Sequence, residues 1–296
     1  MSAQIIKSTF QSSGTSQGCP QAAFPGTSRF RSAPSSKQRV TKLDSRPPRT
    51  PLIWAGGKAA PALYPPIAGA IDLTGINRFV EPFCGGAALS LAVLRDTDLR
   101  VWLNDIDAAI ASFWAAVFDG TAAQAVAKVR ATNQAPTRSE YVAMQRNIRA
   151  GNRDPYEILV VSRFSRSGTF TQGGMRSDAA KRWIHRDRWC ETIESLRVYA
   201  DRVAVTDRDG IAVIDDLTSS DFALVDPPYP GVGDSLYRNR MPKADHARLA
   251  FALRRTPARW LMSSTPDAAS LYARLCEIEE IGKSGRRTTE VIITPR

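Results

Sequence analysis

The stretch Phe222-Ala223-Leu224-Val225-Asp226-Pro227-Pro228-Tyr229 joins four apolar residues to an acid, two prolines and an aromatic residue. The apolar half predicts a buried strand, so the polar half falls at the carboxyl end of that strand. Open α/β sheets bind their ligands in the crevice outside those ends. The two prolines continue neither a strand nor a helix, so they stiffen the turn. The stretch therefore predicts an α/β fold with a ligand site at residues 226–229.

The side chains and backbone of this turn suit an exocyclic amine on a flat heterocycle. The Asp226 carboxylate and the Pro227 carbonyl can accept its two N–H bonds, and Tyr229 can stack on the ring. Asp-Pro-Pro-Tyr resembles the signature of methyltransferases that act on adenine N6 or cytosine N4. The alternative for a match of four residues is a tight loop after a strand.

Motifs upstream predict the first half of a nucleotide-binding sheet. Residues 77–83 form an expected strand and turn, Gly85-Gly86 follow, and residues 87–95 form an expected helix. The next expected strand, residues 99–103, leads to Asp105. A glycine turn lets the backbone approach a ligand closely, and an acid after the next strand suits two ribose hydroxyls.

The rest of the chain predicts the remainder of the sheet and an insertion. Between about residues 121 and 200 the alternation of strands and helices breaks down. Further strands are expected at 202–205, 222–225 and 259–262, helices at 108–118, about 243–255 and 266–275, and an antiparallel hairpin from 276–281 and 289–294.

Charge and composition divide the chain into three parts. Residues 1–50 hold eight Lys and Arg side chains against Asp44 alone, so +7 of the total net charge of +11 lies there. Their Ser-, Gln- and Pro-rich composition predicts a disordered basic N-terminal arm. Such an arm could touch DNA phosphates, be an inert tail or, as the least favoured choice, be a transit peptide. We expect a catalytic domain from residues 51–120 and 201–296, with residues 121–200 as the inserted region.

Composition also excludes several classes of protein. The hydrophobic content of 43% and charged content of 23% are ordinary for a globular protein, and no apolar run is long enough to cross a membrane. The four cysteines are scattered and there are only two histidines, so we expect neither a metal site nor a disulfide framework. Reduced cysteines favour a cytoplasmic location.

The segment 162–176 interleaves Arg, Ser, Thr and Gly with two Phe residues. Arginines suit phosphates and guanines, and hydroxyls suit base edges, so the segment is typical of a DNA-reading surface. The alternative is a solvated loop with two core aromatics. The candidate DNA-binding residues are Arg163, Ser165, Arg166 and Arg176.

Together these motifs resemble the Dam-type, D12-class DNA adenine-N6 methyltransferases over most of residues 51–296. The resemblance implies a Rossmann-like S-adenosylmethionine-dependent methyltransferase sheet with a C-terminal antiparallel hairpin and an inserted target recognition region. The catalytic residues that it implies are Asp226, Pro227, Pro228 and Tyr229. The residues implied to bind S-adenosyl-L-methionine are Trp54, Ala55, Gly56, Lys58, Pro82, Phe83, Gly85, Gly86, Asp105 and Asp226.

The implied reaction is direct methyl transfer to N6 of an adenine flipped out of double-stranded DNA. The chain departs from the family pattern in its Gly85-Gly86-Ala87 turn, in Ser263-Ser264-Thr265 and most of all in the recognition segment. The target sequence therefore stays open, as does pairing with a restriction enzyme. Cytosine-N4 methylation and an inactive DNA-binding descendant are the alternatives. We expect a monomer, and we expect His246 to be a surface or capping residue.

Overall fold

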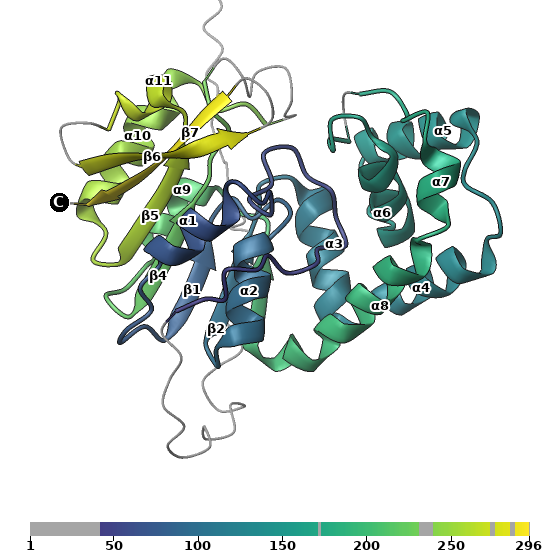
Figure 1. The fold of residues 1–296 in the computed structure, drawn as a ribbon, viewed down its shortest axis with the longest axis horizontal. Helices are drawn as coiled ribbons and strands as arrows, with labels where there is room; N and C mark the ends of the chain where they lie inside the picture. The colour runs from purple at the N-terminus through teal and green to yellow at the C-terminus, as the bar shows by residue number, and fades with distance from the viewer. Residues whose placement is uncertain (1–41, 171–172, 231–238, 273–275, 285–287, 296) are drawn as a thin grey trace, which may run out of the picture. The chain divides into compact units, whose positions relative to one another are not determined.

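The computed structural model describes residues 42–170, 173–230, 239–272, 276–284 and 288–295. Within them a seven-stranded sheet has the order β3-β2-β1-β4-β5-β7-β6 (Figure 1). Strands β1 to β5 run parallel, and β7 pairs antiparallel with both β5 and β6. The strands are β1 (Arg78–Glu81), β2 (Arg100–Asn104), β3 (Val203–Thr206), β4 (Asp221–Val225), β5 (Arg259–Ser264), β6 (Cys276–Ser284) and β7 (Thr288–Pro295).

Alternate residues of each parallel strand enter two separate cores, because successive side chains of a strand point to opposite faces. Phe79 and Phe222 pack in the larger core beneath α1, α2 and α3, whereas Val80 and Ala223 pack in the smaller core with α9 and α10. The helices are α1 (Tyr64–Ala70), α2 (Ala88–Asp96), α3 (Ala108–Asp119), α9 (Gly210–Asp215), α10 (Lys243–Arg255) and α11 (Pro266–Ala269).

This architecture confirms the predicted α/β fold class. The antiparallel β6 and β7 lie where the sequence predicted a hairpin, although the turn between them falls outside the described residues. The strand and helix positions agree with the expectation to within a few residues. The exception is α11, which is shorter than expected because it ends at Ala269. No described helix is long and apolar enough to span a membrane.

The inserted region is largely helical, so the expectation of a loop-like stretch from residue 162 is only partly right. Ser162, Arg163 and Phe164 form the last turn of α6, and the irregular segment begins after them. Phe164, Trp183 and Trp189 pack ring against ring and join this region to the larger core. The elements are α4 (Ala122–Ala131), α5 (Arg138–Arg149), α6 (Pro155–Phe164), α7 (Ala179–Trp183), α8 (Arg186–Leu196) and the 3-10 helix η2 (Arg197–Arg202).

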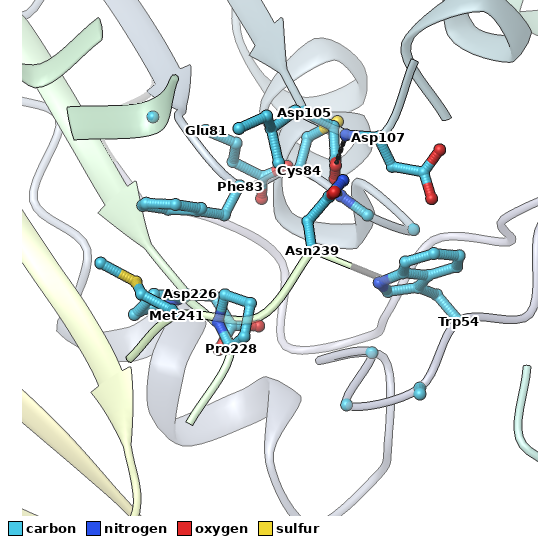
Figure 2. Close-up of a pocket in the computed structure, with 18 of the residues that line it drawn as sticks. Trp54, Glu81, Phe83, Cys84, Asp105, Asp107, Asp226, Pro228, Asn239 and Met241 are labelled. Carbon is cyan, nitrogen blue, oxygen red and sulfur yellow. Dashed lines mark hydrogen bonds between the residues drawn. The ribbon is translucent and has the colours of Figure 1, made fainter. Parts of the chain in front are cut away.

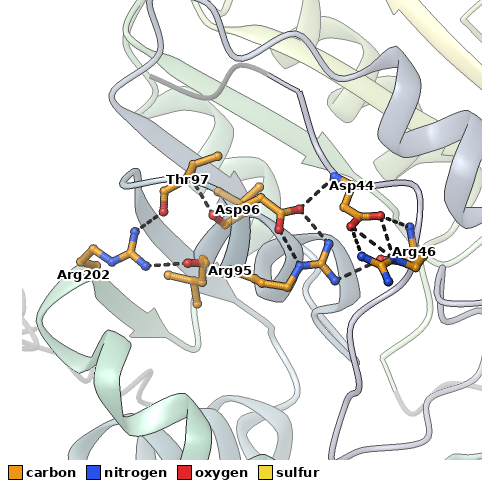
Figure 3. A network of polar contacts seen from close by, with 8 residues as sticks. Asp44, Arg46, Arg95, Asp96, Thr97 and Arg202 are labelled. Carbon is orange, nitrogen blue, oxygen red and sulfur yellow. Dashed lines mark hydrogen bonds and ion pairs between the residues drawn. The ribbon is translucent and has the colours of Figure 1, made fainter. Parts of the chain in front are cut away.

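The end of the expected N-terminal arm belongs to the fold, which corrects the boundary at residue 50. The Asp44 N–H donates to Asp96 at 3.0 Å, and Arg95 donates to the Arg46 carbonyl at 3.1 Å (Figure 3). Arg202 closes the other side of this network with bonds of 2.6 Å to the Leu94 and Thr97 carbonyls. Composition predicted disorder here because it cannot reveal the partners that anchor these residues, which lie about fifty residues away in the sequence. Residues 1–41 lie outside the described part of the chain.

Candidate active site

A cavity of about 270 Å³ opens at the carboxyl ends of the parallel strands. It is lined mainly by the segments 54–58, 83–89, 105–107, 209–211 and 226–229. Figure 2 shows Asp226 and Pro228 on the side of the cavity opposite Asp105 and Asp107. The cavity therefore unites the glycine turn, the acid after β2 and the Asp-Pro-Pro-Tyr turn, which the sequence predicted to converge.

The glycine turn and Asp105 are joined directly. Gly85 has a φ of +44°, which favours glycine, and its N–H donates to Asp105 Oδ2 at 2.9 Å. The Asp107 N–H donates to Asp105 Oδ1 at 2.9 Å. The Trp54 ring lies so close that a Cβ on Gly85 would stand 2.4 Å from Trp54 Cδ1. The turn thus brings bare backbone against the Trp54 ring and holds an acid at the cavity wall.

Phe83 forms an apolar part of the wall, and Pro82 stands behind it. Pro82 is not among the described residues that line the cavity, and its carbonyl accepts a bond of 2.8 Å from Asn104 Nδ2. Phe83 packs on Gly210, where an added Cβ would lie 2.6 Å from the ring. Asp209, which caps α9 and lines the cavity, was missed by the reasoning from sequence. Asp209 follows the parallel strand β3 just as Asp105 follows β2, so the same pattern predicts both residues.

The Asp-Pro-Pro-Tyr turn holds a dense set of polar side chains. Lys58 Nζ donates to Asp226 Oδ2 at 2.9 Å, and Tyr229 Oη donates to Asp226 Oδ1 at 2.8 Å. Tyr229 Oη also lies 2.8 Å from Ser263 Oγ and 3.0 Å from Glu290 Oε2. We name this set of Lys58, Asp226, Tyr229, Ser263 and Glu290 the acid–lysine network. The hydroxyl of Tyr229 points into the protein, while the residue as a whole still lines the cavity.

His246 supports the same turn from behind, so the expectation of a surface or capping role is wrong. Its side chain is fully buried, with Nε2 3.1 Å from the Pro228 carbonyl and Nδ1 2.9 Å from Tyr272 Oη. A carbonyl only accepts, so Nε2 carries the proton and Nδ1 accepts from Tyr272. Burial lowers the pKa of His246, which favours this neutral form.

Burial also raises the pKa values of two acids and one thiol that line the cavity. It raises the pKa of Glu81 to about 8, and Glu81 Oε2 has no hydrogen-bond partner among the described residues. Burial raises the pKa of Asp105, although hydrogen bonds from Asp107 and Gly85 oppose the shift. Burial raises the pKa of Cys84 well above its ordinary value, so this thiol is a poor nucleophile.

The predicted DNA-binding residues fall into two groups. Arg163 is bound inside the fold, where it donates to the Pro51 carbonyl at 2.5 Å and the Thr50 carbonyl at 2.7 Å. Ser165 is buried, 3.2 Å from Ser167 Oγ. Both are structural, which corrects the expectation, since a basic or polar composition does not reveal which side chains face inward. Arg166 is exposed, and Arg176 is half-buried beside Asp178.

The segment 162–176 also reaches the cavity, a contact that the sequence did not predict. Thr169 and Phe170 line it, and the Phe170 ring lies 5.4 Å from that of Trp54. Among the described residues, no group of three or more His, Cys, Asp or Glu side chains could hold a metal ion.

The cavity, lined by several acids, lies at the carboxyl ends of the parallel strands, where open α/β sheets bind their ligands. Residues 54–283 match the family model of the D12 class N6 adenine-specific DNA methyltransferases, and the chain belongs to this family. It is an adenine-specific DNA methyltransferase, and nothing favours cytosine-N4 methylation or an inactive descendant. A search among curated proteins found no match.

Proposed function

We propose that the cavity binds S-adenosylmethionine and that the Asp-Pro-Pro-Tyr turn presents adenine N6 to it. The observation that carries this proposal is the convergence of the glycine turn, Asp105 and Asp226 on one cavity. S-adenosylmethionine supplies an activated methyl group on a positively charged sulfonium, and members of a methyltransferase family use it generally.

The residues of the cavity fit this molecule. The Trp54 and Phe83 rings offer apolar walls for an adenosine, and Asp105 offers a carboxylate for ribose hydroxyls. Glu81 Oε2 is a buried oxygen without a partner among the described residues, which suits a donor brought by a ligand. The residues we assign to cofactor binding are Trp54, Ala55, Gly56, Lys58, Phe83, Gly85, Gly86, Asp105 and Asp226, with Pro82 acting from behind through its carbonyl.

In the proposed mechanism, Asp226 and the Pro227 carbonyl accept the two hydrogens of the adenine amine. Each Asp226 oxygen already accepts one bond, from Lys58 or Tyr229, and keeps a further lone pair for the amine. The Tyr229 ring stacks on the base, and Pro228 is held in place by His246. These groups place the amine lone pair toward the methyl donor, so positioning and electrostatics supply the catalysis.

We propose that exposed Arg166 and half-buried Arg176 contact DNA, since both lie on the irregular segment that reaches the cavity through Thr169 and Phe170. We also propose that the protein acts as a monomer, which light scattering would test. Whether it partners a restriction enzyme would be tested by challenging methylated and unmethylated plasmid in the host.

The experiment that tests the function is transfer of labelled methyl from S-adenosylmethionine to unmethylated plasmid, followed by nucleoside analysis. We expect the label in N6-methyladenine. Calorimetry with S-adenosylmethionine should show one site per chain that weakens when Asp105 is replaced by alanine. An unaltered affinity in that variant would contradict the assignment of the cavity.

A further inference from the structure

The hydroxyl of Tyr229 stands between two carboxylates. Tyr229 Oη lies 2.8 Å from Asp226 Oδ1 and 3.0 Å from Glu290 Oε2. A phenolic hydroxyl has one proton, so it can donate to only one of these oxygens at a time. Two acceptors on one donor form an arrangement in which a proton arriving at one side can release a proton at the other.

Lys58 does not compensate both acids equally. Its ammonium donates to Asp226 Oδ2 at 2.9 Å, to the Gly56 carbonyl at 2.8 Å and to Tyr229 Oη at 3.2 Å. These three bonds use its three hydrogens, and Glu290 Oε2 stands farther away at 3.8 Å. Glu290 is 2% exposed and Lys58 4% exposed. Glu290 is therefore a buried acid whose only direct donors among the described residues are two hydroxyls, those of Tyr229 and Ser263.

Burial raises the pKa of Glu290, and the negative charge of Asp226 acts in the same direction, whereas Lys58 and the two hydroxyls oppose it. The charged groups that face Glu290 are Lys58 and Asp226, and the Asp226 charge also raises the pKa of Glu81 on β1. A carboxylate with a raised pKa is a better proton acceptor near neutral pH.

From the contacts of Tyr229 we propose that Glu290 is the terminal acceptor of the proton that adenine N6 releases, delivered through Asp226 and the Tyr229 hydroxyl. This inference rests on the proposed roles of Asp226 and Tyr229. In this proposal Glu290 acts through the Tyr229 hydroxyl, so it is a relay and positioning residue and not a catalytic residue.

The proton and electron balance of the step closes within the named groups. The N6 lone pair forms the new N–C bond, and the electron pair of the broken C–S bond stays on sulfur as a neutral thioether. The methylated nitrogen then carries one positive charge, and it loses a proton to Asp226. Asp226 passes that proton to Tyr229 Oη as the hydroxyl gives its own to Glu290 Oε2. Asp226 is thereby restored as an acceptor, and Glu290 returns its proton to solvent when the product leaves.

The first test is the pH dependence of single-turnover methyl transfer. Below its pKa Glu290 already holds a proton and cannot accept another, so the wild-type rate should fall as the pH falls. In Glu290→Gln, which keeps an oxygen beside Tyr229, the rate should drop about 10²-fold and this acid limb should vanish. Glu279→Gln makes the same change on exposed β6 and should match the wild type.

Tyr229→Phe breaks the relay at its middle, so the variant should lose the same limb. The double variant Tyr229→Phe/Glu290→Gln should be no slower than Tyr229→Phe alone, because residues that act as one unit are not additive. An acid limb that persists in Glu290→Gln, or losses that multiply in the double variant, would overturn the relay.

A second readout needs neither cofactor nor DNA. In protein labelled with ¹³C at the glutamate carboxyl carbon, the Glu290 signal, identified by its absence in Glu290→Gln, should titrate above the ordinary glutamate range and shift in Tyr229→Phe. A Glu290 signal that titrates in the ordinary glutamate range and is unchanged in Tyr229→Phe would overturn the relay. A wild type that binds S-adenosylmethionine but makes no N6-methyladenine would instead overturn the proposed function, and the relay with it.

Discussion

Lys58 and Asp226 form an ion pair of 2.9 Å that joins the loop ahead of α1 to the turn after β4. The Lys58 side chain is almost fully buried, whereas that of Asp226 is 24% exposed toward the cavity. The pair therefore fixes the carboxylate from inside and leaves its other face for a ligand. One contact thus positions the loop of residues 54–58 against the Asp-Pro-Pro-Tyr turn.

Asp226→Ala should lower the single-turnover rate by about 10²–10³-fold, the usual effect of removing a preorganised polar group. It should also destabilise the fold by about 3–5 kcal/mol, because Lys58 is left as a buried charge without its closest acid. Label transfer and urea denaturation measure the two effects. Asp216→Ala breaks an exposed ion pair with Arg208 and serves as the control. Near-normal turnover in Asp226→Ala would remove this residue from the mechanism.

Gly85→Ala should weaken S-adenosylmethionine binding at least about tenfold, a free-energy loss of about 1.4 kcal/mol. The added Cβ would stand 2.4 Å from Trp54 Cδ1 and 2.5 Å from Nε1, so the ring must leave its place on the cavity wall. Calorimetry measures the change. Gly75 also has a positive φ, of +73°, but an added Cβ there meets nothing within 4 Å. Gly75→Ala thus reproduces the backbone strain alone and should leave affinity unchanged; equal losses would refute the role of Trp54.

The sequence alone predicted that Asp226 and Asp105 lie close together, because both follow apolar strands whose carboxyl ends meet at one edge of the sheet, and both line the same cavity. His246 and Glu290 could not be placed in this way. His246 reaches Pro228 from α10, and Glu290 reaches Tyr229 from the antiparallel strand β7. Such contacts depend on how helices and edge strands pack, which local patterns do not encode.

The errors have the same origin. Arg163 has the composition of a DNA contact, yet the last turn of α6 directs it to the backbone of residues 50 and 51. Asp44 lies in a stretch with the composition of a disordered tail, yet its backbone N–H donates to the Asp96 carboxylate at the end of α2. Composition reports how polar a segment is and not whether a distant partner satisfies it.

Arg163→Ala and Arg166→Ala should separate stability from DNA binding. Arg163 donates to two carbonyls, so its loss should lower the free energy of unfolding by about 1–3 kcal/mol, as measured by urea denaturation. Arg166 is exposed, so its loss should leave stability unchanged while weakening DNA binding and reducing the salt slope by about 1. Fluorescence anisotropy at several salt concentrations measures the second effect. An Arg166→Ala protein with wild-type DNA affinity and salt slope would show that this arginine does not face DNA.

Glu81→Gln should remove a pH-dependent loss of stability. Burial raises the pKa of Glu81 from 4.5 to about 8, so below pH 4.5 the carboxyl is protonated in the folded and the unfolded state alike. Between these two values the folded state keeps the proton and the unfolded state releases it, so the wild type loses stability as the pH rises. At about 1.4 kcal/mol per pKa unit the loss reaches at most about 4–5 kcal/mol.

The amide that replaces the Glu81 carboxyl cannot ionise, so Glu81→Gln should gain stability relative to the wild type between about pH 5 and 8 in urea denaturation. Glu277→Gln, at an exposed position on β6, should follow the wild-type slope. Parallel curves for the wild type and Glu81→Gln would mean that Glu81 is ionised in the folded protein.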